Sequence, residues 1–185
     1  MRSIYWWPIS IAILTAAFFY FIMHGDGYKN GVDSLVGKPV PEVFFSTLKG
    51  NTLGPDKLKG RISLLVFFSS WCPTCHLMKS ILKDLPLPVN GVLYRDPDFV
   101  AENFPVDINI FNELAVDNEG QKSILWGIRG VPEFFLIDAD GVILWHHRGA
   151  ITCEIFEEQV QPLLWKEYTQ KDSPDGPSKT ACIRS

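Results

Sequence analysis

The sequence predicts an α/β fold, a mixed β-sheet flanked by helices, with one transmembrane helix at its N-terminus. Residues 62–68 form a continuous apolar run of strand length, which is typical of a strand buried on both faces. A helical pattern and a second strand candidate follow it, and two later β-rich runs around an Asp-Gly pair predict a hairpin. Ahead of all of these come 20 residues without a formal charge.

The uncharged stretch, residues 4–23, has the length of a membrane crossing, about 30 Å at 1.5 Å per helical residue. Arg2 precedes it and Asp26 follows it, so the positive-inside rule places residues 1–3 in the cytoplasm and the rest of the chain outside. The alternative is a cleaved signal peptide, which needs small residues at its cleavage site, whereas Ala16-Ala17 is followed by bulky side chains. Under either interpretation the domain is exported to oxidising surroundings.

The rest of the chain predicts one domain between a tether and a tail. Residues 24–34 are polar and contain glycine, as tethers do, and residues 171–185 have almost no apolar side chains, so a disordered tail is expected. The domain is expected over residues 35–170, and 46% hydrophobic residues suffice for one core. A net charge of −4 without a Lys/Arg cluster argues against a nucleic-acid partner.

Within the domain, a strand, a helix and a strand come first, and then two strands and a helix. Pro73 begins the first helix, where its missing N–H costs nothing. With this helix as the crossover connection, the strand at residues 89–94 is expected to lie parallel to the first strand. Strands over residues 133–137 and 142–146 pair antiparallel across the Asp-Gly turn. The last helix, residues 154–168, is expected to kink at its internal proline.

Cys72 and Cys75 follow the first strand directly, and several kinds of site contain such a pair. A structural zinc site needs further ligands, but the other two cysteines are far apart, and the adjacent His146 and His147 of a strand point to opposite faces. A c-type haem attachment needs a histidine directly after the second cysteine, and His76 meets that requirement. The buried strand before the pair and the apolar helix after it leave little room for haem.

A third kind of site exchanges electrons through the cysteine pair itself. Cys72 is expected at a helix N-terminus, where unsatisfied N–H groups and the helix dipole stabilise a thiolate. A thiolate opens disulfides, and Cys75, one turn into the helix, can resolve the resulting mixed disulfide. This interpretation predicts a thiol:disulfide oxidoreductase whose redox-active group is the Cys72–Cys75 disulfide, with no metal and no other cofactor.

Two motifs carry a resemblance to a known family. They are WCPTC, residues 71–75, after a buried strand, and Gly130-Val131-Pro132-Glu133 before FFLIDADGVILWHHRG. Together they resemble the thioredoxin superfamily, and within it the membrane-anchored, TlpA-like thiol:disulfide interchange proteins called DsbE or CcmG. The likeness covers about residues 35–168 and is poorest between residues 96 and 123. It implies a thioredoxin-like fold, a single-pass anchor in the inner (cytoplasmic) membrane and a domain in the periplasm.

The resemblance also assigns a docking surface around the cysteine pair. Pro132 is expected to be the cis-proline of the family, whose loop lies beside the cysteines and presents the Val131 backbone to a substrate chain. Trp71 is expected to pack over the pair and to form the docking surface together with Pro73 and Thr74. Core packing of the Trp71 ring is the alternative.

Thioredoxins carry a buried Asp where this chain has Val66, so protons must be handled differently. Glu133 is the candidate, because a partly buried carboxylate can exchange a proton with Cys75; a solvated Glu at a strand edge is the alternative. The stretch Tyr94-Arg95-Asp96 resembles a Tyr-Lys-Asp stretch of the family and is interpreted as a charge pair at a strand end. The two remaining cysteines, 153 and 182, are expected to have no catalytic role and can pair to fix the tail.

The function implied by the resemblance is reduction of the CxxCH disulfide of an apocytochrome c, or of a mixed disulfide of the haem-ligation machinery, before haem is attached. A membrane thiol donor of the DsbD type would return the electrons. Two alternatives stay open: a general periplasmic disulfide oxidase or isomerase, and a redox-idle binding module with a thioredoxin fold.

Overall fold

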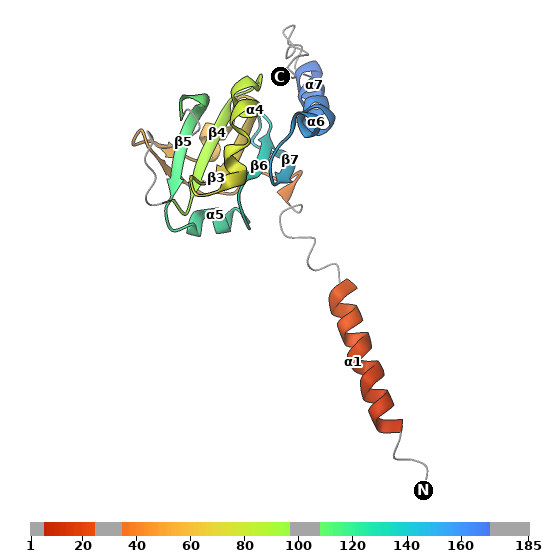
Figure 1. The fold of residues 1–185 in the computed structure, drawn as a ribbon. Helices are drawn as coiled ribbons and strands as arrows, with labels where there is room; N and C mark the ends of the chain where they lie inside the picture. The colour runs from red at the N-terminus through yellow and green to blue at the C-terminus, as the bar shows by residue number, and fades with distance from the viewer. Residues whose placement is uncertain (1–5, 25–34, 97–107, 171–185) are drawn as a thin grey trace. The chain divides into compact units, whose positions relative to one another are not determined.

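The structure, a computed structural model, describes residues 6–24, 35–96 and 108–170 (Figure 1). The chain divides into two compact units, Met1–Ser34 and Leu35–Ser185, at the expected end of the tether. The predicted segments that lie outside the described residues are 1–3, 25–34 and 171–185.

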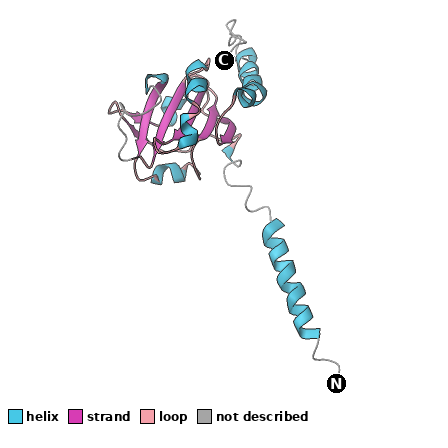
Figure 2. Cartoon of the chain, viewed as in Figure 1, coloured by secondary structure: helices cyan, strands magenta, loops and turns pink. Residues whose placement is uncertain are grey.

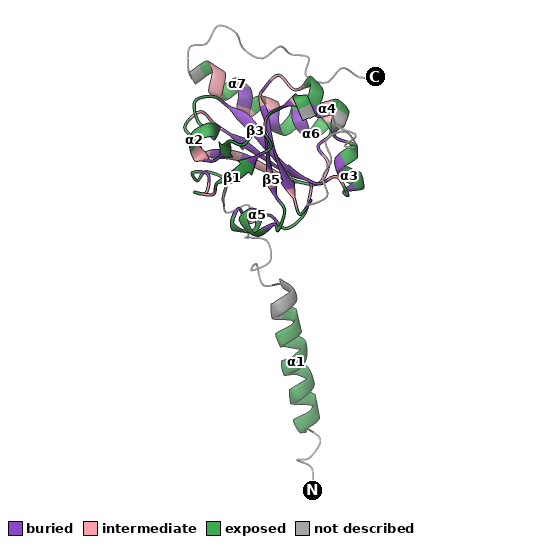
Figure 3. Ribbon diagram, turned by 90° about the vertical axis from the view of Figure 1, so that its left-hand side faces the viewer, coloured by how far each residue is buried: buried purple, intermediate pink, exposed green. Residues whose placement is uncertain are grey.

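In the first unit, helix α1 (Trp6–His24) coincides with most of the predicted anchor, residues 4–23. Its described side chains are exposed, as the green colour in Figure 3 shows. In the described parts of the chain, no helix is both long enough and apolar enough to cross a membrane. The transmembrane role of this segment therefore stays a prediction.

One mixed β-sheet of seven strands forms the centre of the domain (magenta in Figure 2). The strands are β1 (Phe45–Thr47), β2 (Thr52–Leu53), β3 (Ser63–Phe68), β4 (Val89–Tyr94), β5 (Phe111–Asp117), β6 (Glu133–Ile137) and β7 (Ile143–Arg148). Their order is β2-β1-β5-β4-β3-β6-β7, with β3, β4 and β5 parallel and antiparallel pairs on either side. The predicted α/β fold with a mixed sheet is confirmed. Because β3, β4 and β5 are parallel, their carboxyl ends share one edge of the sheet, and the cysteine pair follows β3 at that edge.

Short helices cover the sheet. They are α2 (Pro55–Leu58), α3 (Pro73–His76), α4 (Lys79–Asp84), the 3₁₀ helix η4 (Ile108–Ile110), α5 (Gln121–Leu125), α6 (Cys153–Ile155), the π-helical turn η5 (Phe156–Val160) and α7 (Gln161–Gln170). The single helix expected after Pro73 is divided into α3 and α4. The Leu77 N–H bonds to the Thr74 carbonyl oxygen, three residues back, so a tighter turn interrupts the α-helical pattern.

The C-terminal helix departs from regular geometry where the sequence predicts a kink. The π-helical turn η5 ends at Val160, two residues before Pro162. Proline has no N–H to donate, and its ring clashes with the carbonyl group four residues earlier in a regular helix. The wider π-turn removes that clash, so the proline shapes the helix without ending it.

The two faces of the sheet have separate cores, because successive side chains of a strand point to opposite faces. The face that carries the cysteines is covered by α4 and the C-terminal helices, and its side chains are buried (purple in Figure 3). Its fully buried members are Leu64, Val66, Phe68, Cys75, Met78, Leu93, Phe134, Leu136, Phe156 and Val160.

The opposite face is packed mainly by aromatic rings. The centroids of Phe45, Phe67, Trp126 and Phe135 lie 5.4–5.9 Å apart in successive pairs. Such pairs contribute about 0.5–1.5 kcal/mol each beyond the area that they bury. Trp126 follows α5 directly, so this cluster holds α5 against the sheet.

Candidate active site

The cysteine pair occupies the turn between β3 and α3. Cys72 is the residue before the first turn of α3, and its Sγ accepts a hydrogen bond from the Cys75 N–H at 3.2 Å. The two sulfurs form a disulfide. Cys75 is fully buried, whereas Cys72 keeps 5% of its surface. Cys72 is therefore the more accessible residue of the pair, and its role as the attacking cysteine stays a prediction.

The loop before β6 lies beside the cysteine pair. The Val131–Pro132 peptide bond is cis, as predicted. The Val131 carbonyl oxygen lies 3.6 Å from the Cys72 Sγ, so this loop and the reactive sulfur face each other directly. Pro132 is buried and Val131 is half-buried. A chain that reaches Cys72 must therefore pass next to the Val131 backbone.

The surface around Cys72 is apolar and exposed. Pro73 and Thr74 are exposed, and Trp71 keeps 57% of its surface, which excludes core packing of its ring. The Trp71 indole Nε1 donates a hydrogen bond to the Arg95 carbonyl oxygen at 2.9 Å, and this bond holds the exposed ring in one orientation. Leu77, which the sequence analysis does not single out, is 73% exposed next to α3. The docking role of these side chains stays a prediction.

Glu133 is almost completely buried, and its carboxylate is surrounded by hydrogen-bond donors. Oε1 accepts from the Arg129 N–H at 2.9 Å and from the Gly130 N–H at 3.2 Å. Oε2 lies 3.1 Å from the His146 Nε2, and the half-exposed Arg148 Nε lies 3.5 Å from Oε1. Glu133 is thus not a solvated strand-edge residue. It fastens the loop that carries the cis-proline to its own strand and to β7.

The carboxylate of Glu133 lies on the face of the sheet away from Cys75. Phe134 belongs to the core that contains the cysteines, and Glu133 precedes it by one position, so its side chain points the other way. Its partner His146 stacks on Phe135, with ring centroids 4.7 Å apart, on that same opposite face. The geometry therefore supports a role in holding the loop, and direct proton exchange with Cys75 stays an untested prediction. Val66 lies on the cysteine face, in an apolar core.

The segment that follows β4 also contacts the turn that carries the cysteines, a contact that the sequence does not predict. Asp96 is 4% exposed, and its carboxylate accepts hydrogen bonds from Ser70, two residues before Cys72. Arg95 has other partners, the Tyr94 ring and the Glu119 carbonyl oxygen. The predicted charge pair at this strand end is therefore wrong, because the two charged side chains point to different neighbours.

The remaining candidates from the sequence are the side chains considered for a haem or zinc site and the other two cysteines. The His76 Nε2 lies 2.8 Å from the Ser70 carbonyl oxygen, so this ring bonds within its own turn. Across the ranges that the structure describes, no cluster of three or more His, Cys, Asp or Glu side chains could hold a metal ion. Cys153 takes part in a disulfide, and Cys182 lies outside the described residues.

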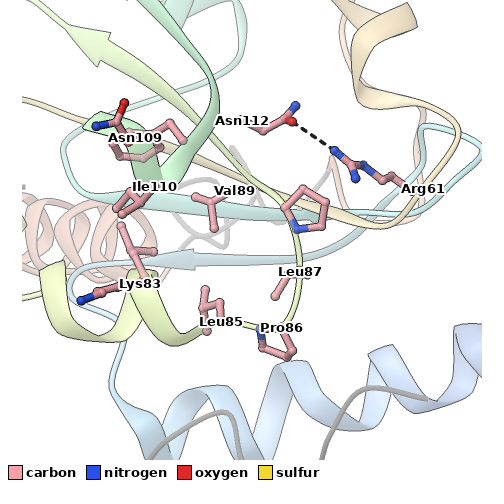
Figure 4. A pocket seen from close by; sticks show the side chains of 12 residues that line it. Arg61, Lys83, Leu85, Pro86, Leu87, Val89, Asn109, Ile110 and Asn112 are labelled. Atoms are coloured by element: carbon pink, nitrogen blue, oxygen red, sulfur yellow. Dashed lines mark hydrogen bonds between the residues drawn. The ribbon is translucent and has the colours of Figure 1, made fainter. Parts of the chain in front are cut away.

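A surface hollow of about 470 Å³ lies at the other end of the parallel strands (Figure 4). It is lined by the first residues of β4 and β5, Val89 and Phe111, and by the end of α4. Arg61 and Asn112, also in its lining, are joined by a 3.1 Å hydrogen bond, which Figure 4 shows as a dashed line. Because the cysteines follow the carboxyl end of β3, this hollow is separate from the redox site.

Comparison with known proteins agrees with this geometry. A family model described as a thioredoxin-like domain matches residues 56–163. The thiol:disulfide interchange protein DsbE of Escherichia coli K12 is 32% identical over 154 residues, covering 80% of this chain and 83% of that protein. The DsbE homolog of Paracoccus denitrificans is 34% identical over 138 residues, covering 72% of this chain and 77% of that protein.

A solved structure shares the fold. It is that of dsbF from Mycobacterium tuberculosis, with a TM-score of 0.58 at 22% identity, covering 67% of this chain and 98% of that one. The fold, the cysteine pair beside a cis-proline and the similarity over most of the chain agree with one another. The chain therefore belongs to the thioredoxin-like family, among the relatives of the DsbE thiol:disulfide interchange proteins, and is a thiol:disulfide oxidoreductase.

Proposed function

We propose that this chain is a membrane-tethered periplasmic reductant that opens the CxxCH disulfide of an apocytochrome c during cytochrome c maturation. The observation that carries the proposal is the Cys72 sulfur, 3.6 Å from the Val131 carbonyl oxygen, in a chain similar to DsbE proteins. A main-chain oxygen beside the sulfur can accept a hydrogen bond from an extended substrate chain, as in other cases of strand addition.

The reaction transfers two electrons from the cysteine pair to the substrate. The Cys72 thiolate attacks one sulfur of the substrate disulfide, a mixed disulfide forms, and the other substrate sulfur leaves as a thiolate. The Cys75 thiolate then attacks the Cys72 Sγ. The products are the Cys72–Cys75 disulfide and a substrate with both thiols reduced. The protein needs no metal and no other cofactor for these steps, because the electrons come from its own two sulfurs.

The cysteine pair must be reduced again before the next turnover. In the proposal a membrane thiol donor of the DsbD type supplies the two electrons by the reverse exchange with Cys72. Residues 4–23, which carry no formal charge, would hold the domain at the periplasmic face of the inner membrane. Tethering raises the effective concentration of the domain near other membrane-bound components. Alkaline extraction of membranes tests this part, because an anchored chain stays in the pellet and a peripheral one is released.

A trap for mixed disulfides tests the substrate. Cys75→Ala, expressed in the native host with residues 1–34 present, can still attack through Cys72 but cannot resolve the product. Mixed disulfides are then isolated under non-reducing conditions and identified by mass spectrometry. The matched control is a variant with both cysteines replaced, which captures nothing through this site.

The composition of the trapped material decides between the alternatives. Apocytochromes together with a membrane thiol donor would support the proposal. A broad range of exported proteins would point to a general oxidase or isomerase, and an empty trap would favour a binding module whose cysteines stay oxidised.

A further inference from the structure

We propose that Asp96 is a positioning residue for Cys72, acting through Ser70. The inference depends on thiol–disulfide exchange at Cys72 and not on the identity of the substrate. It concerns the turn between β3 and α3, whose place against the cis-proline loop decides where the Cys72 Sγ lies.

The topology of the sheet brings Asp96 to this turn. β3 and β4 are parallel neighbours, and Phe68 at the end of β3 pairs with Leu93 near the end of β4. The segments that follow β3 and β4 therefore leave the sheet side by side. Three side-chain groups join them, since Ser69 Oγ donates to the Tyr94 carbonyl oxygen and the Trp71 indole Nε1 donates to the Arg95 carbonyl oxygen, and Asp96 supplies the third link.

Asp96 holds two of the polar groups of Ser70. Its Oδ2 accepts from the Ser70 N–H at 2.6 Å, and its Oδ1 accepts from the Ser70 Oγ at 2.8 Å. The third group, the Ser70 carbonyl oxygen, accepts from the His76 Nε2 at 2.8 Å. Hydrogen bonds to a buried carboxylate are shorter and stronger than those between neutral groups. Ser70 is therefore fixed on all sides, two residues before the reactive cysteine.

The backbone before Asp96 is held in an uncommon conformation. Arg95 has φ +49°, a left-handed conformation that costs free energy for a residue with a side chain. It is supported by the Arg95 N–H, which bonds to the Asp117 carbonyl oxygen at 3.0 Å, and by the guanidinium over the Tyr94 ring. This turn directs Asp96 at Ser70. Unfavourable backbone conformations that their surroundings maintain are concentrated at functional sites.

The position of Ser70 matters because exchange requires the attacking sulfur to be aligned with both sulfurs of the substrate. The Cys72 Sγ lies 3.6 Å from the Val131 carbonyl oxygen, so the docking loop and the sulfur must keep their spacing. A displacement of about 1 Å at a reacting atom can lower a rate about 100-fold. Loss of the Asp96 carboxylate frees the turn and allows such a displacement.

Kinetics with a small disulfide test the inference directly. The reduced protein is mixed with 5,5′-dithiobis(2-nitrobenzoate), which oxidises the cysteine pair to a disulfide and is itself reduced to two coloured thiolates. Asp96→Ala is expected to lower the second-order rate constant between about 10-fold and 100-fold. Asp96→Asn keeps an oxygen for the Ser70 N–H and an amide that can donate to the Ser70 Oγ. It is expected to stay within about threefold of the unmodified protein.

Asp117 provides a matched control on another strand. It is 6% exposed, and its Oδ2 accepts from the Ser123 N–H and from the Ser123 Oγ, both at 2.6 Å, so it fastens α5 instead of the cysteine turn. Asp117→Ala removes the same kinds of side-chain bond but keeps the main-chain carbonyl oxygen that bonds to the Arg95 N–H, and it is expected to lower the melting temperature by a similar amount. Its exchange rate should stay unchanged.

Two results would overturn the inference. One is a rate for Asp96→Ala equal to that of Asp117→Ala, and the other is a rate for Asp96→Asn as low as that of Asp96→Ala, which would assign the effect to charge. If Asp96→Ala does not fold, Ser70→Ala replaces it, because it removes only the Oγ bond; a fall of about threefold to tenfold supports the inference and an unchanged rate refutes it. None of these outcomes depends on which substrate the Cys75→Ala trap captures.

Discussion

Replacing Glu133 by alanine should remove much of the stability of the domain. The carboxylate accepts two backbone hydrogen bonds, from Arg129 and Gly130, and faces His146 across 3.1 Å. A hydrogen bond to a charged group contributes about 1.5–3 kcal/mol, so the two backbone bonds alone contribute about 3–6 kcal/mol. The contact with Arg148 adds little, because that side chain is 39% exposed. We therefore expect Glu133→Ala to lower the free energy of unfolding by about 3–6 kcal/mol, because it leaves the Arg129 and Gly130 N–H groups without this acceptor.

Urea unfolding followed by far-UV circular dichroism measures this loss. All variants are kept oxidised, so that the Cys72–Cys75 disulfide makes the same contribution in each. Glu158→Ala, at an exposed position of η5, is the control and should change the free energy of unfolding by less than about 0.5 kcal/mol. A loss below about 1 kcal/mol for Glu133→Ala would refute the reasoning, because leaving two buried N–H groups without an acceptor should cost more free energy than that.

Glu133→Gln separates the two roles of this side chain. Glutamine keeps an oxygen for the loop N–H groups but cannot take up or release a proton at neutral pH. If Glu133 only holds the cis-proline loop, the pH dependence of the exchange rate keeps its shape in this variant. If Glu133 exchanges a proton with Cys75, as the sequence predicts, the profile changes its shape even when the fold is retained.

Three further predictions concern the core, the docking surface and the second pair of cysteines. Gly91→Ala should destabilise the domain by about 1–3 kcal/mol in urea unfolding, because the added Cβ would lie 2.9 Å from the Leu114 side chain. Trp71→Ala should raise the KM for a peptide disulfide several-fold and change the melting temperature little, because the ring is 57% exposed; an unchanged KM would remove it from the docking surface. Cys153 and Cys182 are expected to pair, so a variant with both CxxC cysteines replaced by serine should take up an alkylating agent under denaturing conditions only after reduction.

The strands that the sequence predicts well are those buried on both faces. Residues 89–94 and 133–137 have the predicted bounds; their apolar side chains are buried, and Pro88 and Pro132 directly precede their first residues. β5 (Phe111–Asp117) was missed because exposed and half-buried positions interrupt its apolar residues. The hairpin of β1 and β2 has strands of only three and two residues, too short for any periodicity to be visible.

The chemistry of the site was predictable where it is local in sequence. Cys72, Cys75 and the cis bond before Pro132 each belong to a short motif. The contact between Asp96 and Ser70 joins residues 26 positions apart, and only the parallel pairing of β3 with β4 brings them together. The direction of the Glu133 side chain could have been deduced from alternation along β6, since Glu133 and Phe135 share a face.

The two buried carboxylates near the site, Asp96 and Glu133, act on the two sides of Cys72. Asp96 bonds to the turn before the cysteine, and Glu133 bonds to the loop whose Val131 carbonyl oxygen faces the sulfur. Neither carboxylate lies in the core beneath the cysteines, which is apolar at Val66. A charge in that core would need a partner of its own to offset its desolvation. This chain instead uses its buried charges at the edge of the sheet, where backbone N–H groups bind them and where they fix the two loops that define the path of the attacking sulfur.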